Sequence, residues 1–342
     1  MKVRSTLQLA IMIIALAILI AVLQSLNNML PAIAQVPTII FSTRGVFDIE
    51  TGMMVSPPPT LSNATTLLGL DGQNCPGEIA IYIHGVWSNS ESAEEQIERV
   101  ALSIAANNYQ TTLVGLSWDS DTEVSPIGWG IAKMIANENR LLLADFISEF
   151  KGQCPQDNVR IIGHSLGSRV IFSALHSLAQ DNNNTEWNIN NFKIASIHLM
   201  GAAIDDEQVS TEANDCMPNR PPLSCSGNVT NSEVEVFYNL INAQDNLLQF
   251  TYGQHESDFA LGHLGAEDIT KTPTNYVEYT VLSSIPPVWD ADGNGEDDCY
   301  DAYIFQWGDN HCGYMGFRNL AGTIWDGWKD GAIEEVVLDW TS

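Results

Sequence analysis

The chain contains few basic residues: its 342 residues include 14 Lys and Arg but 42 Asp and Glu, a formal net charge of −28. Phosphate groups and anionic lipid headgroups repel such a surface, which argues against nucleic acid or an anionic membrane as a partner. The chain also has no internal repeat and no long low-complexity tract, so it is not a repeat array. With 45% hydrophobic residues, it can bury a large core in one α/β domain or in two small ones.

The first 34 residues differ in composition from the rest of the chain. Lys2 and Arg4 precede an unbroken apolar run over residues 9–23, and small residues follow in segment 31–35. This order is typical of a secretory signal peptide and its cleavage site, and an uncleaved membrane anchor is the alternative. Both interpretations predict that the remaining residues are exported, either secreted or attached to the outer face of the cell membrane.

Six cysteines in an exported chain predict three disulfides. Two of the cysteines each lie a few residues before a predicted strand, and these two strands are expected to be neighbours in the sheet. Two further pairs bracket a Pro-rich loop and an acidic loop. We therefore predict the pairs Cys75–Cys154, Cys216–Cys225 and Cys299–Cys312.

Apolar segments alternate along the chain with segments of helical periodicity. Segment 79–84 is a continuous apolar strand of the kind that is buried on both faces of a parallel sheet. Helical patterns cover 90–107 and 136–150 and follow Ser165. The other predicted strands are 38–41, 65–70, 111–118, 159–163, 193–200, 233–241 and 275–282.

This alternation of strand, helix and strand predicts an α/β fold with a doubly wound, mostly parallel sheet and helices on both faces. We expect residues 35–342 to form a single domain. Two regions interrupt the alternation and are predicted to be insertions, one near 207–232 and one near 285–300. The apolar, Gly-rich segment 124–135 is interpreted either as a lid over an acyl pocket or as a helix packed on the core.

The motif Gly163-His164-Ser165-Leu166-Gly167 joins a predicted strand directly to a predicted helix. A serine hydroxyl becomes a nucleophile only when it is held beside a base, and a sharp strand-to-helix turn exposes it for this purpose. The two glycines allow the turn, because side chains there would collide with the neighbouring strand and helix. The context favours a nucleophilic Ser165 over a structural Gly-rich turn.

A second turn, His84-Gly85-Val86-Trp87, ends the strand that is expected to lie beside the Ser165 strand. A backbone amide in this turn, that of Val86, is predicted to point at the same place as the amide of Leu166. Two such donors stabilise the oxyanion of an acyl transfer by on the order of 3 kcal/mol each. The alternative is an ordinary turn between a strand and a loop.

With these motifs the chain resembles the α/β-hydrolase superfamily, in particular its lipase- and esterase-like members. The resemblance implies the order Ser, acid, His along the chain. Asp245 matches the acid that follows a late strand, and His311 matches the final histidine. Ser165 would then attack the substrate, His311 would transfer its proton, and Asp245 would orient and stabilise the imidazolium.

Other residues compete for the acid and the base. Asp205 and Asp206 follow the predicted strand 193–200, where some lipases place the acid. His255 and His263 are alternatives to His311. We interpret the remaining histidines as structural residues, namely His84 behind the oxyanion turn and His164 in packing, and we assign no role to His176 and His198.

The acidic segment between the last predicted strand and His311 has the spacing of a calcium-binding loop. It departs from that pattern in having Asp at the last position and no obvious flanking helices. A disordered acidic loop is the alternative. The predicted Ca²⁺ ligands are Asp290, Asp292, Asn294, Glu296, Asp298 and Asp301. We hypothesise that the ion and the predicted Cys299–Cys312 disulfide together hold the loop that carries His311.

The sequence thus predicts an exported serine hydrolase acting on carboxylic esters, either a carboxylesterase or a lipase. No cofactor is needed for this catalysis. The alternatives are an acyltransferase, thioesterase or peptidase with the same triad, and an inactive binding module stabilised by calcium. The expected partner is a small-molecule or lipid ester, and a membrane only through an uncleaved N-terminal segment.

Overall fold

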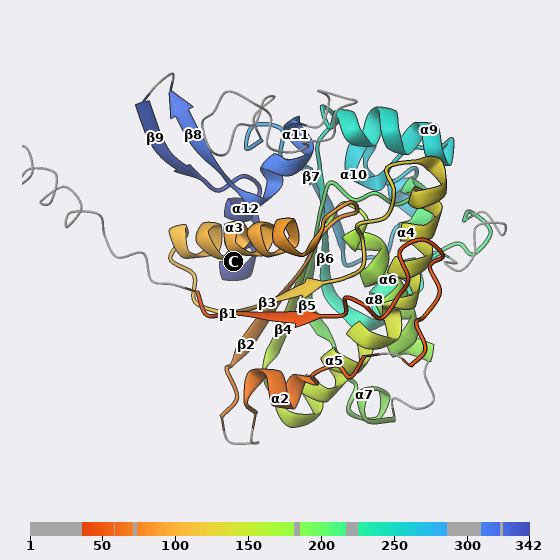
Figure 1. Ribbon diagram of the computed structural model, residues 1–342, viewed down its shortest axis with the longest axis vertical. Helices are drawn as coiled ribbons and strands as arrows, with labels where there is room; N and C mark the ends of the chain where they lie inside the picture. The colour runs from red at the N-terminus through yellow and green to blue at the C-terminus, as the bar shows by residue number, and fades with distance from the viewer. Residues whose placement is uncertain are drawn as a thin grey trace, which may run out of the picture. The chain divides into compact units, whose positions relative to one another are not determined.

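A sheet of seven parallel strands organises the chain in the computed structural model (Figure 1). The structure describes residues 36–57, 59–70, 74–180, 185–216, 225–285, 309–321 and 324–342. These residues belong to one compact unit, Gln35–Ser342. The strand order is β1-β3-β2-β4-β5-β6-β7, and every neighbouring pair is parallel. The strands are β1 (Thr38–Ser42), β2 (Glu78–Ile83), β3 (Thr112–Ser117), β4 (Asn158–His164), β5 (Ile194–Met200), β6 (Val234–Ile241) and β7 (Tyr276–Thr280).

The sheet is covered by helices on both faces, as predicted. In β2, Ile79, Ile81 and Ile83 belong to one hydrophobic cluster, whereas Ala80 and Tyr82 belong to another. Because successive side chains of a strand point to opposite faces, the two clusters lie on opposite sides of the sheet. This is why β2 is apolar without interruption.

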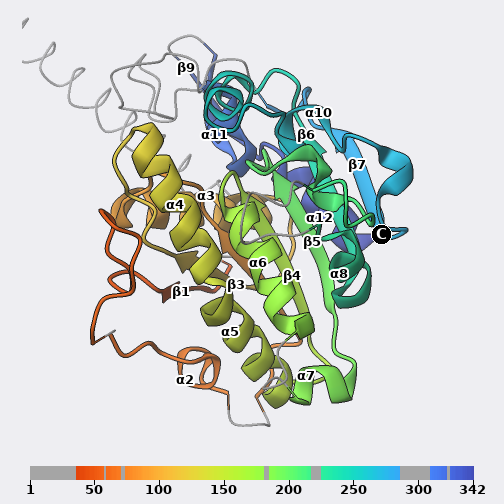
Figure 2. The same cartoon turned by 90° about the vertical axis from the view of Figure 1, so that its right-hand side faces the viewer.

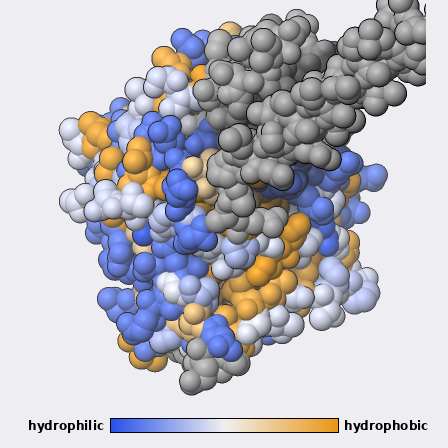
Figure 3. Space-filling model, turned by 90° about the vertical axis from the view of Figure 1, so that its left-hand side faces the viewer, coloured by the Kyte–Doolittle hydropathy of each residue, from blue (hydrophilic) through white to orange (hydrophobic). Residues whose placement is uncertain are grey.

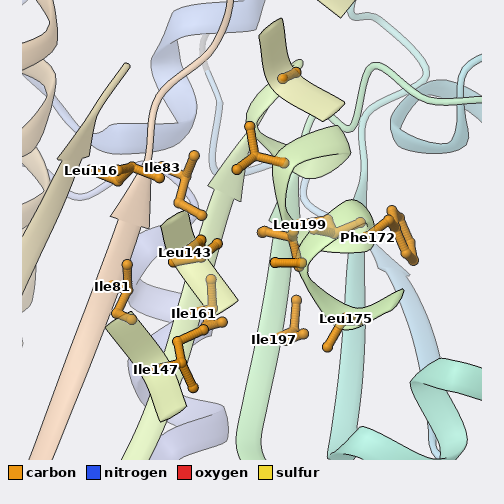
Figure 4. Close-up of a cluster of buried hydrophobic side chains, with 14 of the residues drawn as sticks. Ile81, Ile83, Leu116, Leu143, Ile147, Ile161, Phe172, Leu175, Ile197 and Leu199 are labelled. Atoms are coloured by element: carbon orange, nitrogen blue, oxygen red, sulfur yellow. The ribbon is translucent and has the colours of Figure 1, made fainter. Parts of the chain in front are cut away.

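The first cluster packs against a layer of helices that Figure 2 shows in front of the sheet. Figure 4 shows how Leu143 and Ile147 on one helix and Phe172 and Leu175 on the next meet isoleucines of the strands. The second cluster lies under two helices on the other side of the sheet. The helices of the first layer include α4 (Pro126–Glu138), α5 (Arg140–Gln153), α6 (Gly167–Gln180) and α8 (Gly227–Glu233), and those of the second are α3 (Ser90–Ala106) and α12 (Ile333–Thr341).

One predicted strand is wrong: segment 65–70 forms the helix α2 (Ala64–Leu68). The side chain of Asn63 accepts a hydrogen bond from Thr66 N–H, and Gly69 ends the helix in the left-handed conformation. This pair of caps satisfies backbone groups that the helix leaves unpaired, and it outweighs the strand preference of the two β-branched threonines.

The chain after the seventh strand contains elements that the sequence patterns did not indicate. The one-turn helix α11 (Asp309–Cys312) precedes an antiparallel hairpin of β8 (Phe317–Ala321) and β9 (Ile324–Lys329). The helix α12 then returns to the sheet, where Val336 and Trp340 join the second cluster. Short helices also connect the later strands, namely α7 (Thr185–Asn190), η1 (Asp206–Val209), η2 (Leu247–Tyr252), α9 (Gly253–Glu256), α10 (Leu261–Leu264), η3 (Ile269–Lys271) and η4 (Gly313–Met315).

Two of the three predicted disulfides are confirmed, Cys75–Cys154 and Cys216–Cys225. Cys312 is also disulfide-bonded, whereas Cys299 lies outside the described residues. The first disulfide joins the segments that lead into β2 and β4, at the amino ends of these strands.

Several predictions fall on parts of the chain that lie outside the described residues: the signal peptide or anchor, part of the first insertion and most of the second. No helix in the described part of the chain has the length and hydrophobicity of a transmembrane span. On the face in Figure 3, hydrophilic side chains dominate the area that is not drawn in grey, and an apolar band interrupts them.

Candidate active site

Ser165 lies on a sharp turn between β4 and α6, at the carboxyl edge of the sheet. Its backbone is in the left-handed region, with φ of 52°. Residues other than glycine rarely adopt this conformation. The main chain at the end of β5 and just after it holds this turn: Ser165 N–H donates to Met200 O (3.0 Å), and Ala203 N–H donates to Ser165 O (3.2 Å). The strain is thus held by the central strands, as in a nucleophile elbow.

The glycines around Ser165 are required by close contacts. A Cβ atom on Gly167 would lie 2.5 Å from Ile83 O, and one on Gly163 would lie 2.4 Å from the Ile171 side chain. A Cβ atom on Gly85 would lie 2.8 Å from the Cβ atom of Ser165. The turn after β2 therefore lies directly against Ser165, and its strand is the neighbour of the Ser165 strand, as the sequence predicted.

His84 fixes the orientation of the peptide that carries the Val86 amide. Its Nε2 atom accepts a hydrogen bond from Trp118 N–H (3.1 Å), so Nδ1 carries the proton and donates to Gly85 O (2.8 Å). Burial lowers the pKa of His84 to about 3, so the ring stays neutral. Because a trans peptide directs its C=O and N–H to opposite sides, the Val86 amide points away from His84.

Val86 and Leu166 are the two residues whose amides were predicted to form the oxyanion hole. Within the described residues, neither of these N–H groups donates a hydrogen bond to the protein. A buried amide normally has a partner, so two such donors beside Ser165 are suited to an acceptor atom of a substrate.

Asp245 and His311 form a buried ion-pair-like hydrogen bond. The distance from His311 Nδ1 to Asp245 Oδ2 is 2.6 Å, and both side chains are almost completely buried. Asp245 follows β6, and its other oxygen accepts a hydrogen bond from Leu248 N–H (3.1 Å). The Nε2 atom of His311 makes no hydrogen bond within the described residues, which leaves this nitrogen able to accept a proton.

Gly201 brings the serine turn and this pair to the same place. It follows Met200, whose carbonyl binds Ser165, and it has a φ of 56°. A Cβ atom on Gly201 would lie 3.2 Å from both His311 Cε1 and Asp245 Oδ2. This glycine at the end of β5 therefore lies between the Ser165 turn and the His311–Asp245 pair. The sequence patterns did not indicate a role for Gly201.

Tyr314 is a second residue that sequence analysis missed. It is fully buried, and its hydroxyl group lies 3.4 Å from Asp245 Oδ2. Burial raises the pKa of Tyr314 well above its usual value, and the charge of Asp245 adds to this effect, so the hydroxyl keeps its proton. The sequence signal that could have indicated Tyr314 is its position three residues after His311.

The competing acids have other partners. Asp205 Oδ1 accepts a hydrogen bond from Tyr252 OH. Asp206 lies in an acidic group with Glu207 and Asp258, whose oxygens lie within 4.8 Å of one another. Burial, with the neighbouring Glu207, raises the pKa of Asp206 to about 8.

The competing histidines also have other contacts. His255 stacks on Trp129 at 5.7 Å, and His263 Nε2 lies 3.1 Å from Ala243 O. His176 pairs with Ser226, and His198 with Asp339. These contacts do not involve Asp245.

The segment 124–135 forms the first part of α4, which packs on the core. Trp129, Ala132 and Ile135 are buried, while Ile127 is 74% exposed. Trp129 also contacts the rings of Trp87 and Tyr252, both at 6.0 Å. Since Trp87 is the last residue of the turn after β2, these rings form an aromatic wall beside that turn.

The predicted calcium ligands lie outside the described residues. Two groups of described residues have the spacing of metal ligands, and one of them, Cys75 and Cys154 with Asp157, contains a disulfide that removes its thiolates. The other is the acidic group of Asp206, Glu207 and Asp258.

A family model described as an alpha/beta hydrolase of unknown function (DUF900) matches residues 66–251, a range that includes β2 to β6, Ser165 and Asp245. The chain belongs to this family. The fold and the turn around Ser165 are those of α/β-hydrolases. His311 lies beyond the matched range.

Solved structures of α/β-type enzymes are similar to parts of this chain. Trichoderma reesei cutinase in complex with a C11Y4 phosphonate inhibitor is 16% identical with a TM-score of 0.25, covering 41% of this chain and 59% of the cutinase. The catalytic core of acetyl xylan esterase from Trichoderma reesei is 13% identical with a TM-score of 0.29, covering 48% and 84%. A lipase-esterase related protein from Clostridium acetobutylicum ATCC 824 is 12% identical with a TM-score of 0.31, covering 61% and 86%. A search of the curated proteins gave no match.

Proposed function

We propose that this α/β-hydrolase is an exported serine hydrolase that cleaves carboxylic esters through an acyl-enzyme. The observation that carries the proposal is the strained Ser165, with φ of 52°, at the same sheet edge as the buried His311–Asp245 pair. A left-handed φ at a residue other than glycine costs free energy, and such strain in a strand–turn–helix supports a nucleophile held at the edge of the sheet.

Each residue has a defined part in the reaction. Ser165 Oγ attacks the ester carbonyl while His311 Nε2 removes its proton, and the Val86 and Leu166 amides bind the developing oxyanion. The protonated His311 then gives its proton to the leaving alcohol. Asp245 stabilises the imidazolium and fixes the proton of the neutral ring on Nδ1. Water repeats these steps to release the acid.

The surroundings favour a neutral, apolar ester. The wall of Trp87, Trp129 and Tyr252 offers apolar surface beside the oxyanion turn. The net charge of −28 disfavours anionic substrates. The substrate is therefore a small-molecule or lipid ester, and the activity is that of a carboxylesterase or lipase.

Export and calcium binding belong to the same proposal. The apolar run near the N-terminus and the two disulfides are suited to an oxidising compartment outside the cytoplasm. Calcium would be held by the acidic segment 290–301, which precedes His311. EDTA should then lower the melting temperature, and added Ca²⁺ should restore it; an unchanged melting temperature would rule out this role.

Labelling with a fluorophosphonate probe tests the proposal, because the probe reacts with an activated serine. The wild-type protein should be labelled and Ser165→Ala should not. The matched control is Ser173→Ala, because Ser173 is a buried serine of α6 that bonds Asn137 instead. An unlabelled but folded wild-type protein would point to a binding module.

Chain-length profiles with p-nitrophenyl esters then distinguish a carboxylesterase from a lipase. A preference for short acyl chains indicates the former, and a preference for long, emulsified esters indicates the latter. If the protein cleaves thioesters or peptides but not esters, the assignment of ester substrates is wrong. The proposed role of Ser165 as the nucleophile would still stand.

A further inference from the structure

His164, the residue before the proposed nucleophile, contacts the proposed catalytic histidine, His311. It bonds the main chain of His311, whereas Asp245 bonds the side chain. Its Nε2 atom lies 2.8 Å from the main-chain oxygen of His311. The two imidazole rings also pack together, with centroids 4.7 Å apart and an angle of 42°. These residues are 147 positions apart in the chain, so the contact joins two distant segments.

The chemistry of the contact fixes the protonation of His164. A carbonyl oxygen only accepts hydrogen bonds, so Nε2 must carry the proton and donate it. The Nδ1 atom is buried and has no hydrogen-bond partner within the described residues. Burial lowers the pKa of His164 well below its usual value, and nearby His311 adds to this effect, so the ring stays neutral.

The bond from His164 matters because His311 lies on a very short helix. His311 lies on α11, a single helical turn of four residues, which is too short to be stable by itself. Asp245 holds the side chain at Nδ1 and, within the described part of the chain, makes no bond to the main chain of the residue. The bond from His164 holds the main chain and connects it to the residue next to Ser165.

We propose that His164 is a positioning residue, which sets the distance between the nucleophile and the base through the His311 carbonyl. The proposal rests on the proposed function, since it assumes that His311 is the base. A displacement of a catalytic group by about 1 Å costs on the order of 100-fold in rate, so a single hydrogen bond at this place has a large effect.

Substitution of His164 tests the proposal by the rate of fluorophosphonate labelling and by kcat and KM for an ester. His164→Leu keeps the bulk and removes the donor, and kcat should fall by about 10- to 100-fold with little change in KM. In His164→Gln the amide nitrogen reaches as far as Nε2, so this variant should recover most of the activity. His164→Asn places its nitrogen nearer the main chain and should not.

His198→Gln is the matched control, because His198 is a fully buried histidine on the adjacent strand that pairs with Asp339 instead. It should lose stability but keep the wild-type kcat. If His164→Gln recovers no more activity than His164→Leu, or if both variants keep the wild-type kcat as His198→Gln does, then His164 is only a packing residue and the proposal is wrong.

Nitrogen-15 NMR of the wild-type histidines gives a second measurement that does not depend on folding of the variants. His164 should keep its proton on Nε2, without titrating, from about pH 5 to 8. A proton on Nδ1 would overturn the proposal. A failure of the proposed function gives a different result from a failure of this proposal. In that case fluorophosphonate labelling would not differ between Ser165→Ala and the wild type.

Discussion

The serine turn and the histidine segment reach the same sheet edge by different means. Ser165 is held by main-chain bonds to β5 and by glycines that let β2, β4 and α6 approach one another. His311 lies on one helical turn and depends on side chains of distant residues, namely Asp245 and His164. Backbone topology thus positions Ser165, whereas individual polar contacts position His311.

The largest expected effect comes from the side chain that holds the base. Asp245→Asn should lower kcat by about 10,000-fold, because an amide cannot stabilise the imidazolium and favours the wrong tautomer of His311. Stopped-flow or steady-state ester hydrolysis measures this, and thermal melting checks that the fold persists. Asp205→Asn is the control, since Asp205 bonds Tyr252 instead. Equal losses in the two variants would contradict the assignment of Asp245 as the acid.

The strands that carry the serine turn should depend on the disulfide at their other end. Cys75 and Cys154 are 79 positions apart, and the chain-entropy model predicts that their replacement by Ala costs about 4–5 kcal/mol. Cys216 and Cys225 are 9 positions apart, for which the cost is about 3 kcal/mol. Urea unfolding of the two double variants gives the free energies of unfolding. The reverse order would show that loop entropy does not govern these bonds.

A methyl group tests the backbone contacts of the turn. Gly167→Ala places a Cβ atom 2.5 Å from Ile83 O and should destabilise the protein by about 1–3 kcal/mol. Gly130→Ala in α4 meets no atom within 4 Å and should stabilise by about 0.5–1 kcal/mol, because alanine favours a helix. Chemical unfolding measures both. If Gly167→Ala is as stable as Gly130→Ala, the turn is not held by close packing.

The pH dependence of stability is a further difference between buried groups. Burial lowers the pKa values of His84, His164 and His198. The unfolded chain therefore takes up protons below pH 6.5 that the folded protein does not, and stability falls as the pH is lowered. Each proton contributes up to about 1.4 kcal/mol per pH unit.

Asp206 has the opposite sign. Its pKa is raised from 3.8 to about 8, so the folded protein holds a proton that the unfolded chain loses, and its contribution falls as the pH rises through this window. Asp206→Asn should gain stability relative to the wild type as the pH rises from about 4 to 8. Urea midpoints across this range measure both effects; a constant difference between the proteins would contradict the raised pKa.

The same contrast explains what the sequence could predict. The Ser165 turn, its flanking strand and helix, and the strand of His84 are local patterns, and their parallel arrangement follows from the alternation of elements. Asp245 and His311 were found through the chain order of a resembling family. Of the two confirmed disulfides, Cys75–Cys154 followed from the places of its cysteines before neighbouring strands, and Cys216–Cys225 from its cysteines bracketing a Pro-rich loop.

The rest depends on contacts that leave no local pattern. The bond between His164 and His311 joins residues 147 positions apart, and that of Tyr314 to Asp245 joins residues 69 apart. Gly201 is needed only because three side chains of other segments meet there. The prediction of a strand at 65–70 was wrong for a local reason. The caps Asn63 and Gly69 decided the conformation of this short segment, which contains two threonines.

The Cys75–Cys154 bond has a consequence for how the molecule comes apart. It ties the amino ends of β2 and β4, where Glu78 pairs with Asn158, while the turns of Gly85 and Ser165 leave their other ends. Under heat or denaturant we expect the two strands to open first at the end that carries Ser165. Amide exchange should therefore quicken around Ser165 before it does near Cys154, and the protein should cease to work while most of it is still folded.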